Sequence, residues 1–200
     1  MTLNDLNAIA PIVTAIVIAA TAVAALVQLR HMRAANHIGA MWSVHEMFSD
    51  AGYIGARRYL RTHLARLVAD PGFRGFATME ILGHPPANPP EEYITAINAA
   101  TLIANTHEML GNMIVQGLIN REVMLRGYAW VIDGTWRMME EYVKILRAAE
   151  GGDGLFEDFE YMTVCSRDWI KHNPVSYPKG YGRILPSFSQ PGNGPAVPTA

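Results

Sequence analysis

The chain of 200 residues has one cysteine, Cys165, and few charged side chains. A single cysteine excludes a framework of intrachain disulfides and any zinc site built from several cysteines. Charged residues make up 17% of the chain, against roughly 25% in soluble domains. The net charge of −2 argues against a nucleic-acid-binding protein, because such proteins usually present a strongly basic surface.

The sequence also lacks the motifs of the common enzyme classes. It has no P-loop and no dinucleotide-binding G-x-G-x-x-G. Two His-Glu pairs occur, at 45–46 and 107–108, but Ser49 and Gly111 stand where a zincin helix places its second histidine. We therefore predict a non-enzymatic protein with no catalytic, metal-binding or cofactor-binding residues, and no cofactor.

The stretch Ala8–Leu29 contains no ionisable side chain. As a helix it is about 33 Å long, enough to cross a hydrocarbon core of roughly 30 Å. A secretory signal would need a positive segment before it, which residues 1–7 do not supply. A buried core helix rarely runs this far without a charge. The pattern predicts one transmembrane helix.

The flanks of this stretch indicate its orientation. Asp5 precedes it, whereas Arg30 and Arg33 follow it directly. Because positive residues stay on the cytoplasmic side, we expect the N-terminus outside and the rest of the chain in the cytoplasm.

Small residues recur at four-residue spacing in the predicted span. The pairs are Ala15 with Ala19 and Ala20 with Ala24. Such spacing lets membrane helices approach closely, which predicts packing against other membrane subunits. An alanine-rich composition explains the same pattern equally well.

The following 144 residues, 30–173, predict a helical stalk and a cytoplasmic helical domain, with no strand-like alternation. No proline interrupts the chain between the span and Phe48, so the membrane helix is expected to continue as an amphipathic stalk. Its apolar face combines Ala34, Ile38, Met41, His45 and Phe48, with Trp42 at the edge. We expect His45 to be packed within this face.

Four more helices and a short one are expected after a turn at Asp50. Their ranges are about 53–68, 73–82, 90–116, 121–150 and 156–171, with a proline loop at 83–92. The expected core residues are Ile103, Leu110, Ile114, Tyr128, Val131, Met138, Tyr142, Ile145, Phe159, Met162 and Trp169. The fold class is thus all-α, with one transmembrane helix, residues 1–29, continuing into a cytoplasmic bundle.

Arginines cluster on the second helix, at Arg57, Arg58, Arg61 and Arg66. If the chain turns back towards the membrane at Asp50, these four arginines contact anionic lipid headgroups, as do Arg30 and Arg33 after the span. Each such contact contributes roughly 1 kcal/mol to membrane binding. Docking on an acidic partner is a second interpretation. Ion pairing with the acidic later helices, for example through Glu140, Glu141, Glu157 or Asp158, is a third.

Residues 174–200 form a tail rich in proline and glycine, which cannot build a core. It is expected to be a solvated or extended segment. Tyr177, Tyr181 and Phe188 are the side chains through which it would dock on a partner.

The order of these features resembles a family of uncharacterised bacterial single-pass membrane proteins catalogued as domain of unknown function 4760. The segments that carry the resemblance are VQLRHMRAANHIGAMW, YIGARRYL, IANTHEMLGNMIVQGLINREVML, GTWRMMEEY and FEDFEYMTVCSRDW, over roughly residues 10–170. The resemblance implies a helical domain on one anchor in the bacterial inner membrane, and brings no activity.

Three functions are open from the sequence. The first is a non-catalytic accessory or scaffolding subunit of a larger inner-membrane complex, such as an energy-transducing photosynthetic or respiratory one. The second is a membrane-tethered sensor or signalling adaptor whose helical domain binds a ligand or a cytosolic protein. The third is an enzyme of unrecognised type, using a polar cluster such as Arg57, His107 and Glu108.

Overall fold

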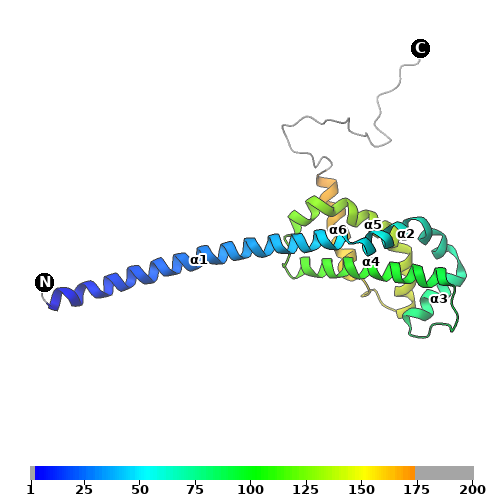
Figure 1. Cartoon of the computed structure of the whole chain (residues 1–200), viewed down its shortest axis with the longest axis horizontal. Coiled ribbons are helices and arrows are strands. Elements are labelled where there is room, and N and C mark those ends of the chain that lie inside the picture. The colour runs from blue at the N-terminus through cyan, green and yellow to red at the C-terminus, as the bar shows by residue number, and fades with distance from the viewer. Residues whose placement is uncertain (1–2, 174–200) are drawn as a thin grey trace, which may run out of the picture.

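The computed structural model describes the backbone of residues 3–173, and the side chains of residues 11, 13–32, 35 and 38–173. The first helix, α1 (Leu3–Ser49), is 47 residues long and projects from the rest of the molecule as a single rod (Figure 1). Five further helices form the head: α2 (Ala51–Ala69), α3 (Pro71–Ile81), α4 (Glu91–Val115), α5 (Arg121–Glu150) and α6 (Glu157–His172). The all-α fold is confirmed, since the described residues contain no strand.

Two aspartates define the boundaries of the first three helices. Asp50 is the only residue between α1 and α2, and its side chain accepts a hydrogen bond from the Tyr53 backbone N–H. Asp70 ends α2 and in turn caps α3, accepting from the Gly72 N–H, with Pro71 at the first helical position. The interruption expected at residues 70–72 is therefore a single residue, Asp70, because α3 begins directly at Pro71.

Glycine and asparagine delimit α4 and α5 as the sequence indicates. Gly117 follows α4 with φ +70°, and Gly151 ends α5 in the left-handed conformation with φ +75°. The Asn120 side chain caps α5 by accepting from the Val123 N–H at 3.1 Å. These local signals place both ends of α5 at the predicted residues.

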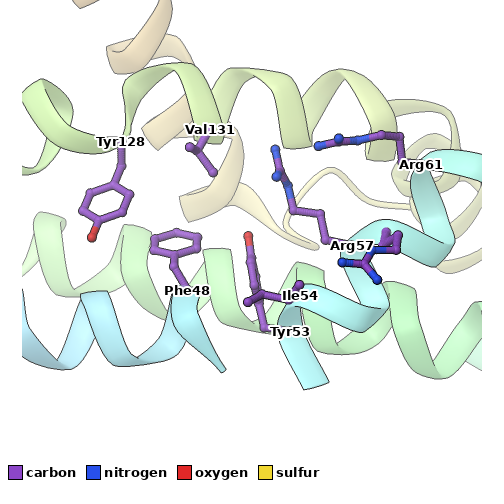
Figure 2. A pocket seen from close by; sticks show the side chains of 8 residues that line it. Phe48, Tyr53, Ile54, Arg57, Arg61, Tyr128 and Val131 are labelled. Carbon is purple, nitrogen blue, oxygen red and sulfur yellow. The ribbon is translucent and has the colours of Figure 1, made fainter. Parts of the chain in front are cut away.

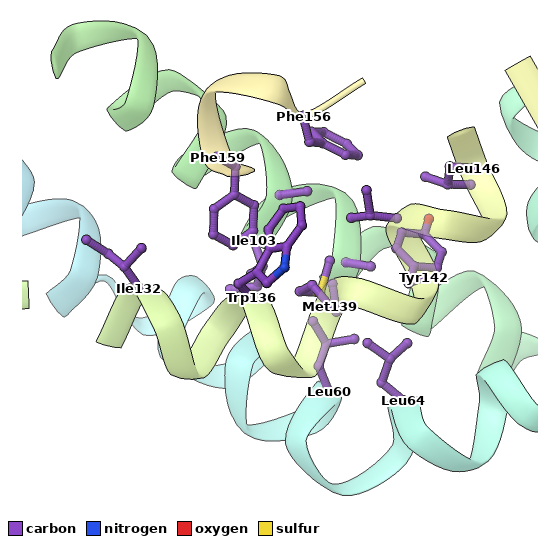
Figure 3. Close-up of a cluster of buried hydrophobic side chains, with 14 of the residues drawn as sticks. Leu60, Leu64, Ile103, Ile132, Trp136, Met139, Tyr142, Leu146, Phe156 and Phe159 are labelled. Atoms are coloured by element: carbon purple, nitrogen blue, oxygen red, sulfur yellow. The ribbon is translucent and has the colours of Figure 1, made fainter. Parts of the chain in front are cut away.

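The core lies where α4, α5 and α6 pack together, with α2 covering α4 and α5 and α3 packing on α5. Trp136 of α5 stands edge-on to Phe159 of α6 with ring centroids 5.0 Å apart, and Leu60, Ile103 and Met139 complete this layer (Figure 3).

The predicted core residues of α4 and α6 are all buried, but those of α5 are only partly so. Tyr142 is buried, whereas Tyr128, Val131, Met138 and Ile145 are half-buried. The fully buried line of α5 runs along the adjacent face, through Met124, Ile132, Thr135, Trp136, Met139, Val143 and Leu146. Aromatic spacing alone predicts the α5 face incorrectly, because the position of α6 decides which face is covered.

The prediction for the stalk face is likewise wrong in part. Val44 is fully buried and Ala40, Met41 and Phe48 pack beside it, but Ile38 is 72% exposed and His45 is exposed. Only the C-terminal part of α1 touches the head (Figure 1), so Met41 and Phe48 of the predicted face are covered, whereas Ile38 is left largely exposed.

One segment of α1, Val13–Met32, is long and apolar enough to cross a membrane, and none of it is buried against the protein. Its 20 residues correspond to about 30 Å of helix, the thickness of a hydrocarbon core. The segment lies slightly towards the C-terminus of the predicted Ala8–Leu29, and it includes Arg30. The described part of the chain therefore has one candidate membrane-spanning helix, which is continuous with the head.

Candidate functional site

The small residues of the span lie on two different sides of α1. All four alanines are exposed. At 100° per residue, Ala20 and Ala24 fall on the side of the helix that carries Ile38 and Trp42, whereas Ala15 and Ala19 are turned by more than about 90° from it.

An exposed apolar surface lies where α1 enters the head. Ile38, Met41, Trp42 and His45 of α1 border a shallow cavity of about 430 Å³ together with Asn120 and Val123 at the start of α5. We call this group the basal apolar surface. Ile38 and Trp42 are 72% and 65% exposed, and the Trp42 indole donates to Glu46 at 2.9 Å. Exposed apolar groups gathered in this way are typical of an interaction site.

The arginines of α2 lie away from the predicted span. Because α2 continues past the end of α1 and not back along it (Figure 1), these side chains are more than about 24 Å of helix beyond Met32. The expected turn back towards the membrane at Asp50 is therefore absent. Arg30 is exposed at the end of the span, and the Arg33 side chain lies outside the described residues.

The four α2 arginines have different partners. Arg66 pairs with Glu92 of α4, and the Arg57 Nε donates to Thr135 Oγ1 at 3.3 Å. The side chains of Arg58 and Arg61 have no hydrogen bond or ion pair within the described part of the chain.

None of these arginines pairs with the acidic residues suggested from the sequence. Glu140 and Glu141 both bind Lys144, at 3.0 and 2.8 Å. Asp158 accepts a hydrogen bond from Asn112 of α4. The ion-pairing interpretation holds for Arg66, with a different carboxylate.

Three of these arginines line a pocket of about 320 Å³ between the end of α1, α2 and α5 (Figure 2). We call it the arginine pocket, and its lining consists of Phe48, Tyr53, Ile54, Arg57, Arg58, Arg61, Tyr128 and Val131. Phe48 and Tyr128 stack at one end, with centroids 4.9 Å apart, and the side chains of Arg57 and Arg61 lie towards the other. The pocket thus has an aromatic half and a cationic half, and no acidic side chain lines it.

Two buried polar atoms beside this pocket lack hydrogen-bond partners within the described residues. One is the hydroxyl of Tyr53, a residue only 4% exposed, and the other is Nε2 of the fully buried His107. Burial raises the pKa of Tyr53 to about 12 against the opposing effects of the Arg57 charge and the Thr135 hydroxyl, and burial lowers the pKa of His107 to about 4. Both side chains are therefore neutral at physiological pH.

The Thr135 hydroxyl does not satisfy Tyr53, although it lies close enough to affect the tyrosine. Thr135 Oγ1 donates its own proton to the Val131 carbonyl oxygen at 2.7 Å, and it accepts from Arg57. No hydrogen bond joins the Tyr53 hydroxyl to Thr135 or to any other group of the described residues.

The His107-Glu108 pair proves to be structural. His107 Nδ1 lies 2.8 Å from the Ile103 carbonyl oxygen, and its ring packs on Phe159. Glu108 accepts the backbone N–H of Phe159 at 2.8 Å, which caps the first turn of α6. The three side chains of the cluster suggested from the sequence therefore lie in different places. Arg57 lines the pocket, His107 is in the core and Glu108 caps α6.

The sequence indicates the arginine cluster of α2 but not the pocket, because Tyr128 and Val131 of the opposite wall come from a helix about 70 residues farther along the chain. A group of three His, Cys, Asp or Glu side chains close enough to hold a metal is absent from the described residues. Cys165 is a free, half-buried thiol on α6. The predicted docking residues Tyr177, Tyr181 and Phe188 lie outside the described residues.

Among the comparisons with known proteins, a match is found to a family model only. No curated protein and no solved structure matches the chain. A family model described as a domain of unknown function (DUF4760) matches residues 15–166, which include most of α1 and nearly all of the head. The chain belongs to this family.

Proposed function

We propose that this protein is a non-catalytic accessory or scaffolding subunit of a larger complex in the bacterial inner membrane. In this proposal α1 is a single-pass anchor, the N-terminus is outside and the head is in the cytoplasm, as Arg30 and Arg33 at the C-terminal end of the span favour. The observation that carries the proposal is the alignment of the small-residue pair in the span with the basal apolar surface on one helix.

The alignment follows from helix geometry. Eighteen residues separate Ala20 from Ile38, and Ala24 from Trp42, which is about five full turns at 3.6 residues per turn. A partner helix that packs closely on Ala20 and Ala24 would therefore leave the bilayer on the side of Ile38 and Trp42. One membrane subunit with a cytoplasmic extension fits both surfaces.

The basal apolar surface has no other element to cover it in the described part of the chain. Ile38 and Trp42 are more exposed than large apolar side chains with a packing role, and Leu118 of the neighbouring α4–α5 turn is 58% exposed. Burying two such side chains would contribute roughly 1.5–3 kcal/mol each to association. This is enough to fix the orientation of a subunit that is already confined to the membrane.

Co-purification from native membranes tests the proposal. The full chain, extracted in mild detergent, is expected to carry a stoichiometric companion of a different sequence. The double variant Ile38→Ser, Trp42→Ser should lose it without a change in melting temperature, because both residues are exposed. Leu102→Ser on the outer face of α4, 42% exposed, is the matched control and should retain it. A monodisperse monomer, or a complex of this chain with itself alone, refutes the proposal.

The alternative of a membrane-tethered sensor or adaptor requires a ligand site on the head. The basal apolar surface does not supply one, since it is shallow and lacks convergent polar groups. The arginine pocket, on a separate part of the head, has such groups.

A further inference from the structure

The arginine pocket carries positive charge that the rest of the head leaves unbalanced. Its lining includes three guanidinium groups and no carboxylate. The Arg57 guanidinium donates one hydrogen bond to Thr135, but Arg58 and Arg61 make no ion pair within the described residues. Three like charges on two turns of one helix repel each other, so an anion in the pocket would be favoured electrostatically.

A second, independent feature points to a ligand. The Tyr53 hydroxyl is buried and has no hydrogen-bond partner within the described residues, and buried hydroxyl groups are otherwise almost always satisfied. Figure 2 shows this oxygen between Phe48 and the Arg57 side chain, directed into the pocket. An oxygen acceptor bound beside the arginines would satisfy it.

The opposite half of the pocket is suited to a flat apolar group. The stacked rings of Phe48 and Tyr128 form one wall, and Val131 and Ile54 complete it. The volume of about 320 Å³ is at the small end of the range for organic ligands. The occupant therefore combines one compact anionic group with a body the size of one or two rings.

We propose that the arginine pocket binds a small, water-soluble phosphate monoester with an aromatic body. The phosphate is held by Arg58, Arg61 and the Tyr53 hydroxyl, and the aromatic body lies against Phe48 and Tyr128. A phosphate carries about −1.5 to −2 charges at pH 7, which matches the two free guanidinium groups better than a carboxylate does. This binding site goes beyond the proposed subunit function and does not depend on it.

The same phosphate chemistry is present in lipid headgroups, but the position of the pocket favours a soluble source. Phe48 lies about 24 Å along α1 from Met32, the end of the candidate span, and α2 extends farther away (Figure 1). This distance exceeds the depth of a headgroup layer.

Calorimetric titration of the full chain in nanodiscs of neutral lipid, with phenyl phosphate as the probe, tests this inference. We expect saturable binding that is about tenfold weaker in Arg58→Gln and in Arg61→Gln. Arg126→Gln, which removes an exposed arginine of α5 outside the pocket, should bind the probe as the wild type does. Inorganic phosphate, which lacks the aromatic body, should bind more weakly than the probe.

Tyr53→Phe separates a ligand contact from a structural role. It removes only the unpartnered hydroxyl, so the melting temperature should be unchanged or higher, while the probe binds about threefold or more weakly. The inference is overturned if the probe shows no saturable binding, or if Arg126→Gln weakens it as much as the pocket variants. It is equally overturned if nanodiscs of anionic lipid abolish probe binding at matched ionic strength, since the pocket would then be filled by headgroups.

Discussion

Gly111 is a point of close approach between α4 and α6, and Gly111→Ala tests how tightly the head is packed. A Cβ atom at this position would lie 2.3 Å from the carbonyl oxygen of Asp158 and 2.5 Å from its carbonyl carbon. Carbon atoms are essentially never found closer than 3.0 Å, so α6 must move by about 0.7 Å. The obstacle is backbone, and rotation of a side chain cannot relieve it.

Two opposing effects set the change in the free energy of unfolding. Alanine raises helix propensity by about 1 kcal/mol over glycine, but overpacking of a tight contact costs about 1–3 kcal/mol or more. Moving α6 also weakens its cap, the 2.8 Å hydrogen bond from the Phe159 N–H to Glu108. We expect a net loss of about 2 kcal/mol, and a fall in melting temperature of about 4–8 °C for a chain of this size.

The matched control is Gly134→Ala, the same substitution in the interior of α5. A Cβ atom there meets nothing within 4 Å, so the variant should be more stable by about 0.5–1 kcal/mol. Both changes are measured by thermal unfolding of the full chain in detergent, with near-ultraviolet circular dichroism reporting the packing of Trp136. If Gly111→Ala melts at or above the wild-type temperature, the close contact of α4 and α6 is refuted.

Two further predictions concern buried polar groups. His107 is held neutral by burial, with a pKa of about 4 in the folded head against the ordinary value of 6.5, so its contribution to stability is complete above pH 6.5 and is lost as the pH falls towards 4. Denaturant unfolding should show a loss of about 2 kcal/mol from this group between pH 7 and pH 5, and His107→Leu should flatten that slope; an unchanged slope contradicts the assignment. Asp133, nearly fully buried on α5, binds Arg167 of α6 at 2.8 Å and also Arg137, so Asp133→Asn should destabilise the head by about 2–3 kcal/mol. Glu141→Gln, at an exposed pair with Lys144, is its control, and equal melting temperatures for the two variants would show that the buried pair contributes nothing.

The helices and their ends are largely predictable, because their signals are local. Asp50, Asn120 and Gly151 each act on backbone groups within four residues, so a cap is visible without knowledge of the fold. The candidate membrane span is equally local, since a run of apolar residues long enough to cross a bilayer requires no tertiary contact.

The packed faces are less predictable, because a helical face is buried only when another element lies over it. Ile38 and Trp42 have the spacing of core residues, but α1 packs on the head through the neighbouring face of Ala40, Met41, Val44 and Phe48. On α5, the position of α6 decides that Trp136 and not Tyr128 lies at the centre of the core.

The sequence by itself determined the helical content, the capped boundaries and one apolar span continuous with a stalk, since all of these depend on residues close together along the chain. Only the tertiary structure decided that α2 continues away from the span, so that Arg57 and Arg61 share a pocket with Tyr128 of α5 (Figure 2). It also decided that the start of α6 packs closely on Gly111 and is capped by Glu108. These contacts join residues dozens of positions apart, and no local pattern of charge or hydropathy specifies which distant side chain will be their neighbour.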